Sequence, residues 1–332
     1  MAALNLLTDV PGIAVGHATD LDLGSGVTVV LFAEPCVVSV TVGGGAAGLR
    51  DTAMLDPAAT VERIDAIVFS GGSAYGLDAA GGVQAVLRAA GRGMPLGGQR
   101  VALAAQAILF DLSGSGRKDW ADFPPYRDLG RDAALAARGG VFALGSVGAG
   151  TGATTATWKG GIGSASACTE AGHTVGALAA VNAMGSATIG DGPHFWAAPY
   201  ESGDEFGGLG WPRDKFDLRL PGKLRSETPA TTLVLVATDA ALSKPQAFRL
   251  ATMANDGLAR AIVPSHAPMD GDAVFAASTG SRPLARPIPE LTELGHVAAI
   301  AVARAIARGV FEAARLPHAD ARPAWRDRFL LG

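Results

Sequence analysis

The stretch TPATTLVLVATDAAL, residues 228–242, places two adjacent threonines, Thr231 and Thr232, where a long polar segment meets an apolar run. Threonine is β-branched and suits the first positions of a strand. Taken locally, the stretch predicts a buried strand that begins at residue 231, and this strand explains both threonines. The rest of the chain decides whether either hydroxyl has a second role.

The 332 residues are 48% hydrophobic, which is enough for a substantial core in one large domain or in two tightly joined ones. We predict a single catalytic domain over residues 1–332. The formal net charge is -4, and no run of Lys and Arg with interleaved aromatic residues is present. Nucleic acid is therefore not an expected partner, because phosphate binding needs concentrated positive charge. The abundance of glycine favours a layered α/β enzyme with many tight turns.

The sequence also bears on the cellular compartment. Cys36 and Cys168 lie far apart without the spacing of metal ligands, and MAALNLLTDVPG at the N-terminus lacks the basic and apolar parts of a signal peptide. We therefore expect a cytoplasmic protein with reduced thiols. The longest apolar run, residues 295–314, carries arginines at helical intervals and predicts a buried amphipathic helix, so no membrane contact is expected.

Apolar and β-branched runs alternate irregularly with helical patterns along the chain. We predict strands at 26–32, 35–45, 65–70, 105–110, 141–147, 153–160, 173–185, 231–239 and 272–279. Helices are predicted at 77–93, 131–140, 242–262 and 295–314. Because several strands follow one another, we expect antiparallel hairpins between helical layers. Residues 190–230 are rich in Gly, Pro and charge, and such a long loop inside a compact domain is usually functional or disordered.

Two glycine-rich motifs resemble catalytic signatures without completing them. GGSAYG, residues 71–76, has Tyr75 where a nucleophile elbow needs glycine, and a turn with Ser73 capping a helix explains it. GAGTG, residues 148–152, resembles a phosphate-binding loop, but no Gly-Lys-Ser/Thr follows. A nucleotide-dependent enzyme is therefore only a distant alternative.

Metal binding is not indicated, and no cofactor is expected. No two histidines stand at the short separation typical of a zinc site, so each is expected to be structural or exposed. Asp270-Gly271-Asp272 alone is a weak cation signal and is more typical of a turn. The alternative is that Asp270 and Asp272, at the start of a strand, orient a nucleophile and its base.

Two polar residues interrupt apolar surroundings. Lys159 lies in the glycine-rich ATTATWKGGIGSAS, where a cation is costly to bury unless a partner or a task retains it; an exposed strand end is the alternative. Asn182 interrupts GALAAVNAMG, and a buried amide must be hydrogen-bonded. Its NH₂ group can serve a structural carbonyl or an oxyanion.

Six blocks of this chain, in order, resemble the N-terminal-nucleophile hydrolases that include the L-aminopeptidase/D-amidase-esterase (DmpA type), the β-peptidyl aminopeptidases and the nylon-oligomer (6-aminohexanoate-oligomer) hydrolase. The blocks are VPGIAVGHATD with GVTVVLF, FSGGSAYGLDAAGGV, GSVGAGTGATTATWKGGIGSAS, VGALAAVNAMG, TTLVLVATDAAL and MDGDAVFAASTG. The threonine and the D-x-D motif are most similar to the nylon-oligomer hydrolase branch. The resemblance implies an αββα four-layer sandwich, assembly as a homotetramer, and hydrolysis of small amides, short peptides or ω-amino-acid oligomers.

Members of this family cleave themselves before a Ser or Thr at the start of a strand. On this sequence the resemblance places the cut between Ala230 and Thr231, which gives fragments 1–230 and 231–332; Thr232 is the fallback nucleophile. The new N-terminus would carry its own base, because an α-amine has a pKa of about 7.7 to 8.0 in short peptides and an amide nitrogen is not basic. Ala230 stands where related sequences have Asn or Gly, so the alternative function is an unprocessed, non-catalytic binding or assembly protein on the same scaffold.

The same resemblance assigns the remaining roles. Lys159 is expected to hold the amine unprotonated, and Asn182 to bind the oxyanion. Asp270 and Asp272 are expected to orient the hydroxyl and the amine. Tyr75 is expected to line the substrate pocket.

Overall fold

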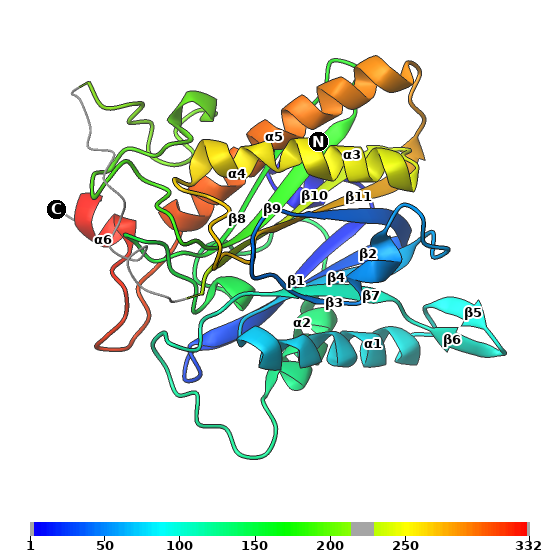
Figure 1. The fold of residues 1–332 in the computed structure, drawn as a ribbon, viewed down its shortest axis with the longest axis horizontal. Helices are drawn as coiled ribbons and strands as arrows, with labels where there is room; N and C mark the ends of the chain where they lie inside the picture. Colours follow the sequence, from blue (N-terminus) through cyan, green and yellow to red (C-terminus); the bar gives the residue numbers. More distant parts are fainter. Residues whose placement is uncertain (1–2, 214–228, 331–332) are drawn as a thin grey trace.

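A computed structural model describes residues 3–213 and 229–330 of this chain (Figure 1). Its strands are β1 (Ile13–Asp20), β2 (Ser25–Val42), β3 (Gly48–Arg50), β4 (Ile64–Ser70), β5 (Met94–Leu96), β6 (Gln99–Val101), β7 (Ala104–Ile108), β8 (Ile162–Cys168), β9 (Thr174–Asn182), β10 (Thr231–Ala240) and β11 (Ala273–Arg282). Its α-helices are α1 (Ala79–Ala89), α2 (Tyr126–Ala136), α3 (Lys244–Ala254), α4 (Asp256–Ala261), α5 (Pro287–Phe311) and α6 (Trp325–Phe329).

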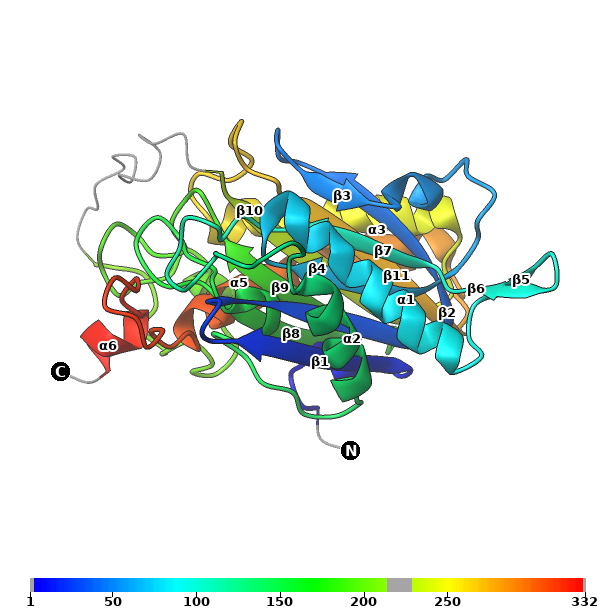
Figure 2. The same ribbon diagram turned by 90° about the horizontal axis from the view of Figure 1, so that it is seen from below.

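The elements form four layers, with two layers of strands between two layers of helices (Figures 1 and 2). The strands follow the order β3-β7-β4-β2-β11-β10-β9-β8, and β1 pairs with β2. The half of the sheet with β1, β4 and β7 is covered by α1 and α2, and the half with β8 to β11 is covered by α3, α4 and α5. The two halves pack face to face over an apolar core, in which the ring centroids of Phe69 and Phe275 lie 5.9 Å apart. The predicted αββα sandwich is confirmed.

β2 spans a region where two strands were predicted, and that prediction was wrong. Residues 27–31 of β2 pair with β4, residues 37–42 pair with β11, and the register shifts between Leu31 and Cys36. Pro35 lies in this shifted part, where its missing N–H does not interrupt a regular ladder. One long strand therefore belongs to both halves of the sheet.

Several other predictions of local structure also need correction. Residues 141–147 and 153–160 are not strands but irregular segments with isolated bridges. The predicted helix 242–262 is two helices, α3 and α4, which meet at Asn255. β8 was not predicted, because its Gly, Ser and Ala residues have low strand propensity. It needs small residues because α5 lies against it, and a Cβ at Gly163 would collide with the backbone of Ala305.

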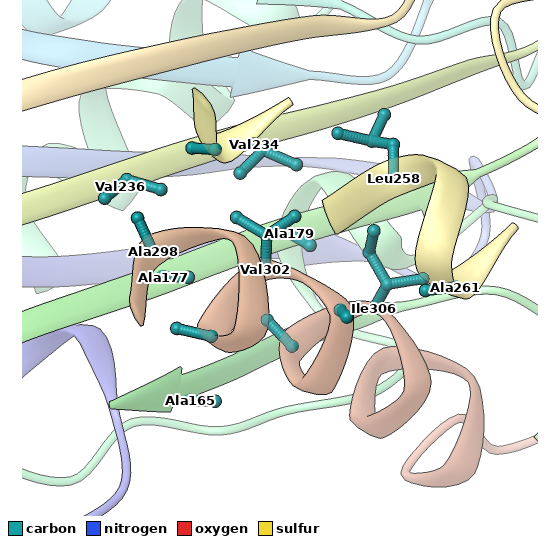
Figure 3. Packing of buried hydrophobic residues seen from close by; sticks show 14 of the residues in the cluster. Ala165, Ala177, Ala179, Val234, Val236, Leu258, Ala261, Ala298, Val302 and Ile306 are labelled. Carbon is teal, nitrogen blue, oxygen red and sulfur yellow. The ribbon is translucent and has the colours of Figure 1, made fainter. Parts of the chain in front are cut away.

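The predicted apolar helix is α5, which begins earlier than expected and is packed against β8 and β9. Figure 3 shows Ala298, Val302 and Ile306 of α5 within the same apolar cluster as Ala179 and Val234. Within the described residues, one helix, α5, is long and apolar enough to cross a membrane. However, 78% of its most apolar segment is buried inside the protein.

β10 begins at Thr231, as predicted, and every one of its residues is buried. It lies between β9, which is antiparallel to it, and β11, which is parallel. In this register Thr231 is opposite Asn182, and Ala230 forms a parallel bridge with Asp270. The start of β10 is therefore flanked by the end of β9 on one side and by the residues preceding β11 on the other.

Candidate active site

Two hydrogen bonds converge on the carbonyl that precedes β10. The Thr231 hydroxyl donates to the Ala230 carbonyl oxygen, and the Gly271 backbone N–H donates to the same oxygen at 2.8 Å. Ala230 and Thr231 are 1% and 3% exposed. A hydroxyl is thus held beside a buried carbonyl that a second donor polarises, and attack on the carbonyl carbon would require the hydroxyl to give up this hydrogen bond and turn its lone pair toward that carbon.

Gly271 was not predicted to take part in this site. A Cβ at this position would come within 2.5 Å of Thr231 Oγ1, so glycine leaves the room that the hydroxyl occupies. The available signal was a glycine between two acids directly before a strand. That signal reports a tight turn, and it does not reveal which carbonyl the glycine N–H will bind.

Thr232, the fallback nucleophile, is placed differently. Its Oγ1 is buried and has no hydrogen-bond partner among the described residues. Successive side chains of a strand point to opposite faces of the sheet, so this hydroxyl lies on the face opposite that of Thr231. Of the two threonines, Thr231 is therefore the one whose hydroxyl contacts the Ala230 carbonyl.

Asp270 and Asp272 are buried and hold the backbone around the Ala230–Thr231 junction. Asp270 Oδ1 accepts from the Met184 N–H at 3.3 Å, and its Oδ2 accepts from the Ala267 N–H at 3.0 Å. Asp272 Oδ1 accepts from the Thr232 N–H at 2.7 Å. The structure therefore brings both predicted carboxylates to the start of β10.

His266 also belongs to this group, although it was expected to be structural or exposed. Its Nδ1 lies 2.9 Å from Asp272 Oδ2, and its backbone N–H donates to the same oxygen at 3.0 Å. The hydrogen bond to Asp272 raises the pKa of His266 above its ordinary 6.5, against the opposing effect of burial, and the charges of Asp272 and Asp270 add to the rise. In the sequence, only its position four residues before Asp270 indicated that His266 could lie near this site.

Lys159 is fully buried, and the alternative of an exposed strand end was wrong. Its Nζ donates to the carbonyls of Gly150, Ala153 and Gly160 at 2.9, 2.7 and 2.8 Å. Burial lowers the pKa of Lys159 to about 7, and the charge of Asp111 acts in the opposite direction. Three carbonyl acceptors also favour the ammonium form, which has three N–H donors.

Asn182 ends β9 directly opposite Thr231. Its Oδ1 accepts from the Thr154 N–H and its Nδ2 donates to the Phe110 carbonyl, both at 2.9 Å. Thr154 also forms an isolated bridge with Lys159. Asn182 and Lys159 therefore belong to one network, and in the intact chain the amide NH₂ serves a structural carbonyl.

The GAGTG segment supplies part of this network. Gly148–Gly150 forms a short 3-10 helix, the Gly150 carbonyl binds Lys159, and the Thr151 hydroxyl donates to the Gly148 carbonyl. Carbonyl oxygens that face a buried lysine do not provide the N–H donors that a phosphate needs. Across residues 3–213 and 229–330, no group of three or more His, Cys, Asp or Glu is arranged to hold a metal ion.

A polar pocket of about 440 Å³ opens beside the junction. Pro229, which precedes Ala230, is part of its wall, together with Phe110 and Thr154, the two residues that bind Asn182. The remaining wall residues are Asp111, Ser113, Gly114, Ser115, Gly152, Asp320, Ala321, Arg322 and Pro323. The pocket therefore reaches the surroundings of both Asn182 and the Ala230–Thr231 bond.

Asp111, a buried wall residue of the pocket, was not predicted either. Its Oδ2 accepts from the Ser25 hydroxyl at 2.6 Å and its Oδ1 from the Gly72 N–H at 2.8 Å. The Tyr126 hydroxyl donates to Ser25 Oγ at 3.2 Å. Burial raises the pKa of Asp111, whereas the charge of Lys118 and the hydrogen bonds from Ser25 and Gly72 act to lower it. The sequence feature that could have identified Asp111 is its place directly after the apolar run 105–110.

Tyr75 lies on a 3-10 helix, Ser73–Asp78, and is 55% exposed. Its ring meets Trp120 edge to face, with the centroids 5.5 Å apart. It is not a wall residue of the pocket beside the junction. The cap expected at Ser73 was wrong, since Gly72 is the N-cap and has a φ of 84°. The structure thus groups the other predicted site residues around β10 and leaves Tyr75 outside that group.

Comparison with solved structures identifies the class of fold. The L-aminopeptidase D-Ala-esterase/amidase of Ochrobactrum anthropi, described as a variant of the Ntn hydrolase fold, is similar with a TM-score of 0.70 and 21% identity, covering 96% of this chain and 90% of that one. A β-aminopeptidase of Burkholderia sp. is similar with a TM-score of 0.67 and 24% identity, covering 98% and 91%. The chain therefore has a mixed α/β fold of the Ntn-hydrolase, DmpA type.

The family follows from the sequence comparisons. The model of peptidase family S58 matches residues 5–323. An uncharacterized aminopeptidase of Mycobacterium tuberculosis is 40% identical, covering 98% of both chains, and one of Mycobacterium leprae is 39% identical, covering 94% of this chain and 91% of the relative. This chain belongs to peptidase family S58 and is an amide or peptide hydrolase. The predicted resemblance is confirmed at that level.

Proposed function

We propose that this protein is a self-processing amide hydrolase that cuts its own Ala230–Thr231 bond and then uses Thr231 as an N-terminal nucleophile. The observation that carries the proposal is the pair of donors on the Ala230 carbonyl, the Thr231 hydroxyl and the Gly271 N–H. The burial of this peptide bond and the family membership support it.

In the self-cleavage step, Thr231 Oγ1 forms a bond to the Ala230 carbonyl carbon, and its proton passes to the Thr231 nitrogen that will leave. The Gly271 N–H stabilises the negative charge that develops on the Ala230 oxygen. The bond from that carbon to the Thr231 nitrogen then breaks, and the nitrogen, with the transferred proton, becomes an α-amine. Water hydrolyses the resulting ester, which frees the Ala230 carboxylate and restores the Thr231 hydroxyl.

In turnover, the new α-amine accepts the hydroxyl proton as Oγ1 attacks a substrate amide. The substrate C–N bond then breaks, the leaving amine takes that proton, and water hydrolyses the acyl-enzyme. A positive Lys159 lowers the pKa of this amine, whereas the charges of Asp270 and Asp272 raise it. Asn182 is the proposed oxyanion donor. Its NH₂ binds the Phe110 carbonyl in the intact chain, so this role requires the amide to exchange partners after cleavage.

We propose short peptides, amino-acid amides and ω-amino-acid oligomers, such as 6-aminohexanoate oligomers, as substrates. The threonine nucleophile and the D-x-D motif support the oligomer substrates, and the aminopeptidase relatives support the peptides. A polar pocket of about 440 Å³ beside the junction suits a short chain with an ionic end. We further propose that the processed pairs assemble as homotetramers in the cytoplasm.

The test is the intact mass of the purified protein under denaturing conditions, with N-terminal sequencing of each fragment and turnover on a panel of these amides. Two fragments, one beginning at Thr231, together with amide hydrolysis are expected. A single full-length chain without turnover would contradict the proposal and would favour the non-catalytic binding or assembly protein. A fragment that begins at Thr232 would reassign the nucleophile.

A further inference from the structure

His266 connects the helical layer to the start of β10. Its Nε2 lies 3.0 Å from Asn255 Nδ2, at the junction of α3 and α4. On its other side, Nδ1 and the backbone N–H both bind Asp272, whose second oxygen binds the Thr232 N–H. A continuous line of hydrogen bonds therefore runs from Asn255 to the residue next to the proposed nucleophile.

The backbone and the packing both restrict where this ring can lie. His266 has a φ of 59°, in the left-handed region that non-glycine residues rarely adopt and where Asn, Asp and His are enriched. Gly43, just beyond the end of β2, leaves space for the imidazole, because a Cβ there would lie 2.8 Å from ring atoms. The ring is thus held from two sides in contact with Asp272.

The Asn255 amide is suited to both charge states of this ring. With Nδ2 toward Nε2, the amide donates to a neutral imidazole whose proton is on Nδ1, facing Asp272. Asn255 Oδ1 is then buried without a hydrogen-bond partner among the described residues. A half-turn of the amide would bring Oδ1 to Nε2, where it would accept the second proton of an imidazolium. The Nδ1–H bond to Asp272 persists in both states.

We propose that His266 is a positioning residue for the chemistry at Thr231, holding Asp272 so that Asp272 fixes the first residues of β10, and offsetting the Asp272 charge when the ring is protonated. This inference rests on the proposed function, because it assigns His266 a role in the same cleavage and turnover. The two can fail separately, since cleavage of the wild-type chain is measured alongside that of the variants.

The proposal implies a pH signature. The charged groups that act on His266 are Asp272 and Asp270, whereas Asn255 and Gly43, which face it from other elements, are neutral. Because the pKa of His266 is raised above 6.5, the imidazolium–carboxylate pair is complete at lower pH and is lost as the pH rises through the raised pKa. The rate of cleavage should show an inflection there, because cleavage precedes the formation of the α-amine that titrates during turnover.

His266→Asn is the matched variant, because asparagine tolerates the left-handed conformation and its NH₂ can replace Nδ1–H as a donor to Asp272, but it carries no charge. His266→Ala removes both the donor and the charge. His296→Asn, at an exposed position of α5, is the control. Full-length chains are made by cell-free synthesis, and their conversion to fragments is followed by intact mass over a pH series on both sides of 6.5.

We expect His266→Ala to slow cleavage by about 10- to 100-fold, as misplacement of reacting groups does, and to lower kcat more than it changes KM. His266→Asn should recover most of the rate but lack the inflection, and His296→Asn should match the wild type. Rates and pH profiles in His266→Ala equal to those of the wild type would overturn the inference. Equal slowing in both His266 variants, with the wild-type inflection retained, would also overturn it.

A second measurement does not depend on the folding of the His266 variants. In uncleaved Thr231→Ala protein, the imidazole signal of His266 is titrated by NMR with and without Asp272→Asn. The midpoint should fall when the carboxylate is removed, and an unchanged midpoint would contradict the pairing. A wild-type chain that neither cleaves nor hydrolyses amides would refute the proposed function, and the role of His266 with it.

Discussion

The two neighbours of β10 contact the Ala230–Thr231 junction in different ways. On the β11 side, the Gly271 N–H binds the carbonyl of the bond itself, and Asp272 binds the adjacent N–H of Thr232. On the β9 side, Asn182 and Lys159 bind backbone groups of the surrounding loops. The β11 side therefore binds the peptide bond that we propose is cleaved, whereas the β9 side is occupied with structural partners.

This difference suggests that the two sides serve different stages. Self-cleavage needs a polarised Ala230 carbonyl, which the β11 side supplies in the intact chain. Turnover needs a free amine with a lowered pKa and an oxyanion donor for a substrate, which are the roles proposed for Lys159 and Asn182. Variants on the two sides should accordingly separate cleavage from turnover.

The largest effect is expected from Thr231→Ala, which removes the group that both stages share. Neither fragments nor turnover should be detectable by intact mass and by an amide assay. Thr232→Ala is the control, since its hydroxyl lies on the other face of β10, and it should retain both activities. Full amidase activity in Thr231→Ala would contradict the assignment of the nucleophile.

On the β9 side, Asn182→Ala should reduce turnover by about 10²- to 10³-fold, the usual effect of losing one oxyanion donor. Cleavage should fall much less, because Gly271 supplies the donor for that step. The two rates are compared in one preparation by intact mass and by kcat/KM. Equal losses in the rates of cleavage and turnover would contradict the idea that the β9 and β11 sides serve different stages.

On the β11 side, Gly271→Ala should slow cleavage by about 10²-fold, because the added Cβ would lie 2.5 Å from Thr231 Oγ1 and displace it. Gly139→Ala is the matched control, since the nearest atom to its added Cβ is 3.7 Å away. A time course of intact mass measures both variants. Normal cleavage in Gly271→Ala would show that this close approach does not matter for the reaction.

A smaller effect is expected from Lys159→Met, which removes a positive charge and therefore raises the pKa of the Thr231 amine. The acid limb of kcat/KM should shift to higher pH, because the amine must be unprotonated to act as a base. The free energy of unfolding should also fall by about 1 to 3 kcal/mol, as buried carbonyls lose their donor.

Lys244→Met is a close control for this variant. Lys244 is also buried, and its Nζ donates to the carbonyls of Met54, Ala59 and Val61 at 3.2, 2.8 and 2.9 Å. It should lose similar stability in a denaturant titration and leave the pH profile of kcat/KM unchanged. If the pH profile of kcat/KM is also unshifted in Lys159→Met, Lys159 has only a structural role, like Lys244.

The pattern of residues predicted several strands of the core and the residues that the structure places at the start of β10. Runs such as 231–239 and 272–279 are apolar and β-branched enough to be recognised locally, and they place Thr231, Asp270 and Asp272 at strand starts. β8 was missed because its composition reflects the close approach of α5 rather than strand propensity. β2 was divided into two strands because local β-branched runs do not reveal that one strand pairs with two different neighbours.

By itself, the sequence determined that a buried strand begins at Thr231. It also showed that Asn182 stands within an apolar run and that Asp270 and Asp272 directly precede or begin another strand. Only the tertiary structure decided that the Gly271 N–H and the Thr231 hydroxyl meet on one carbonyl, that His266 binds Asp272, and that Asp111 lines the pocket. The physical reason is that apolar periodicity encodes burial along one segment, whereas hydrogen-bond partners depend on the register between strands that lie far apart in the chain.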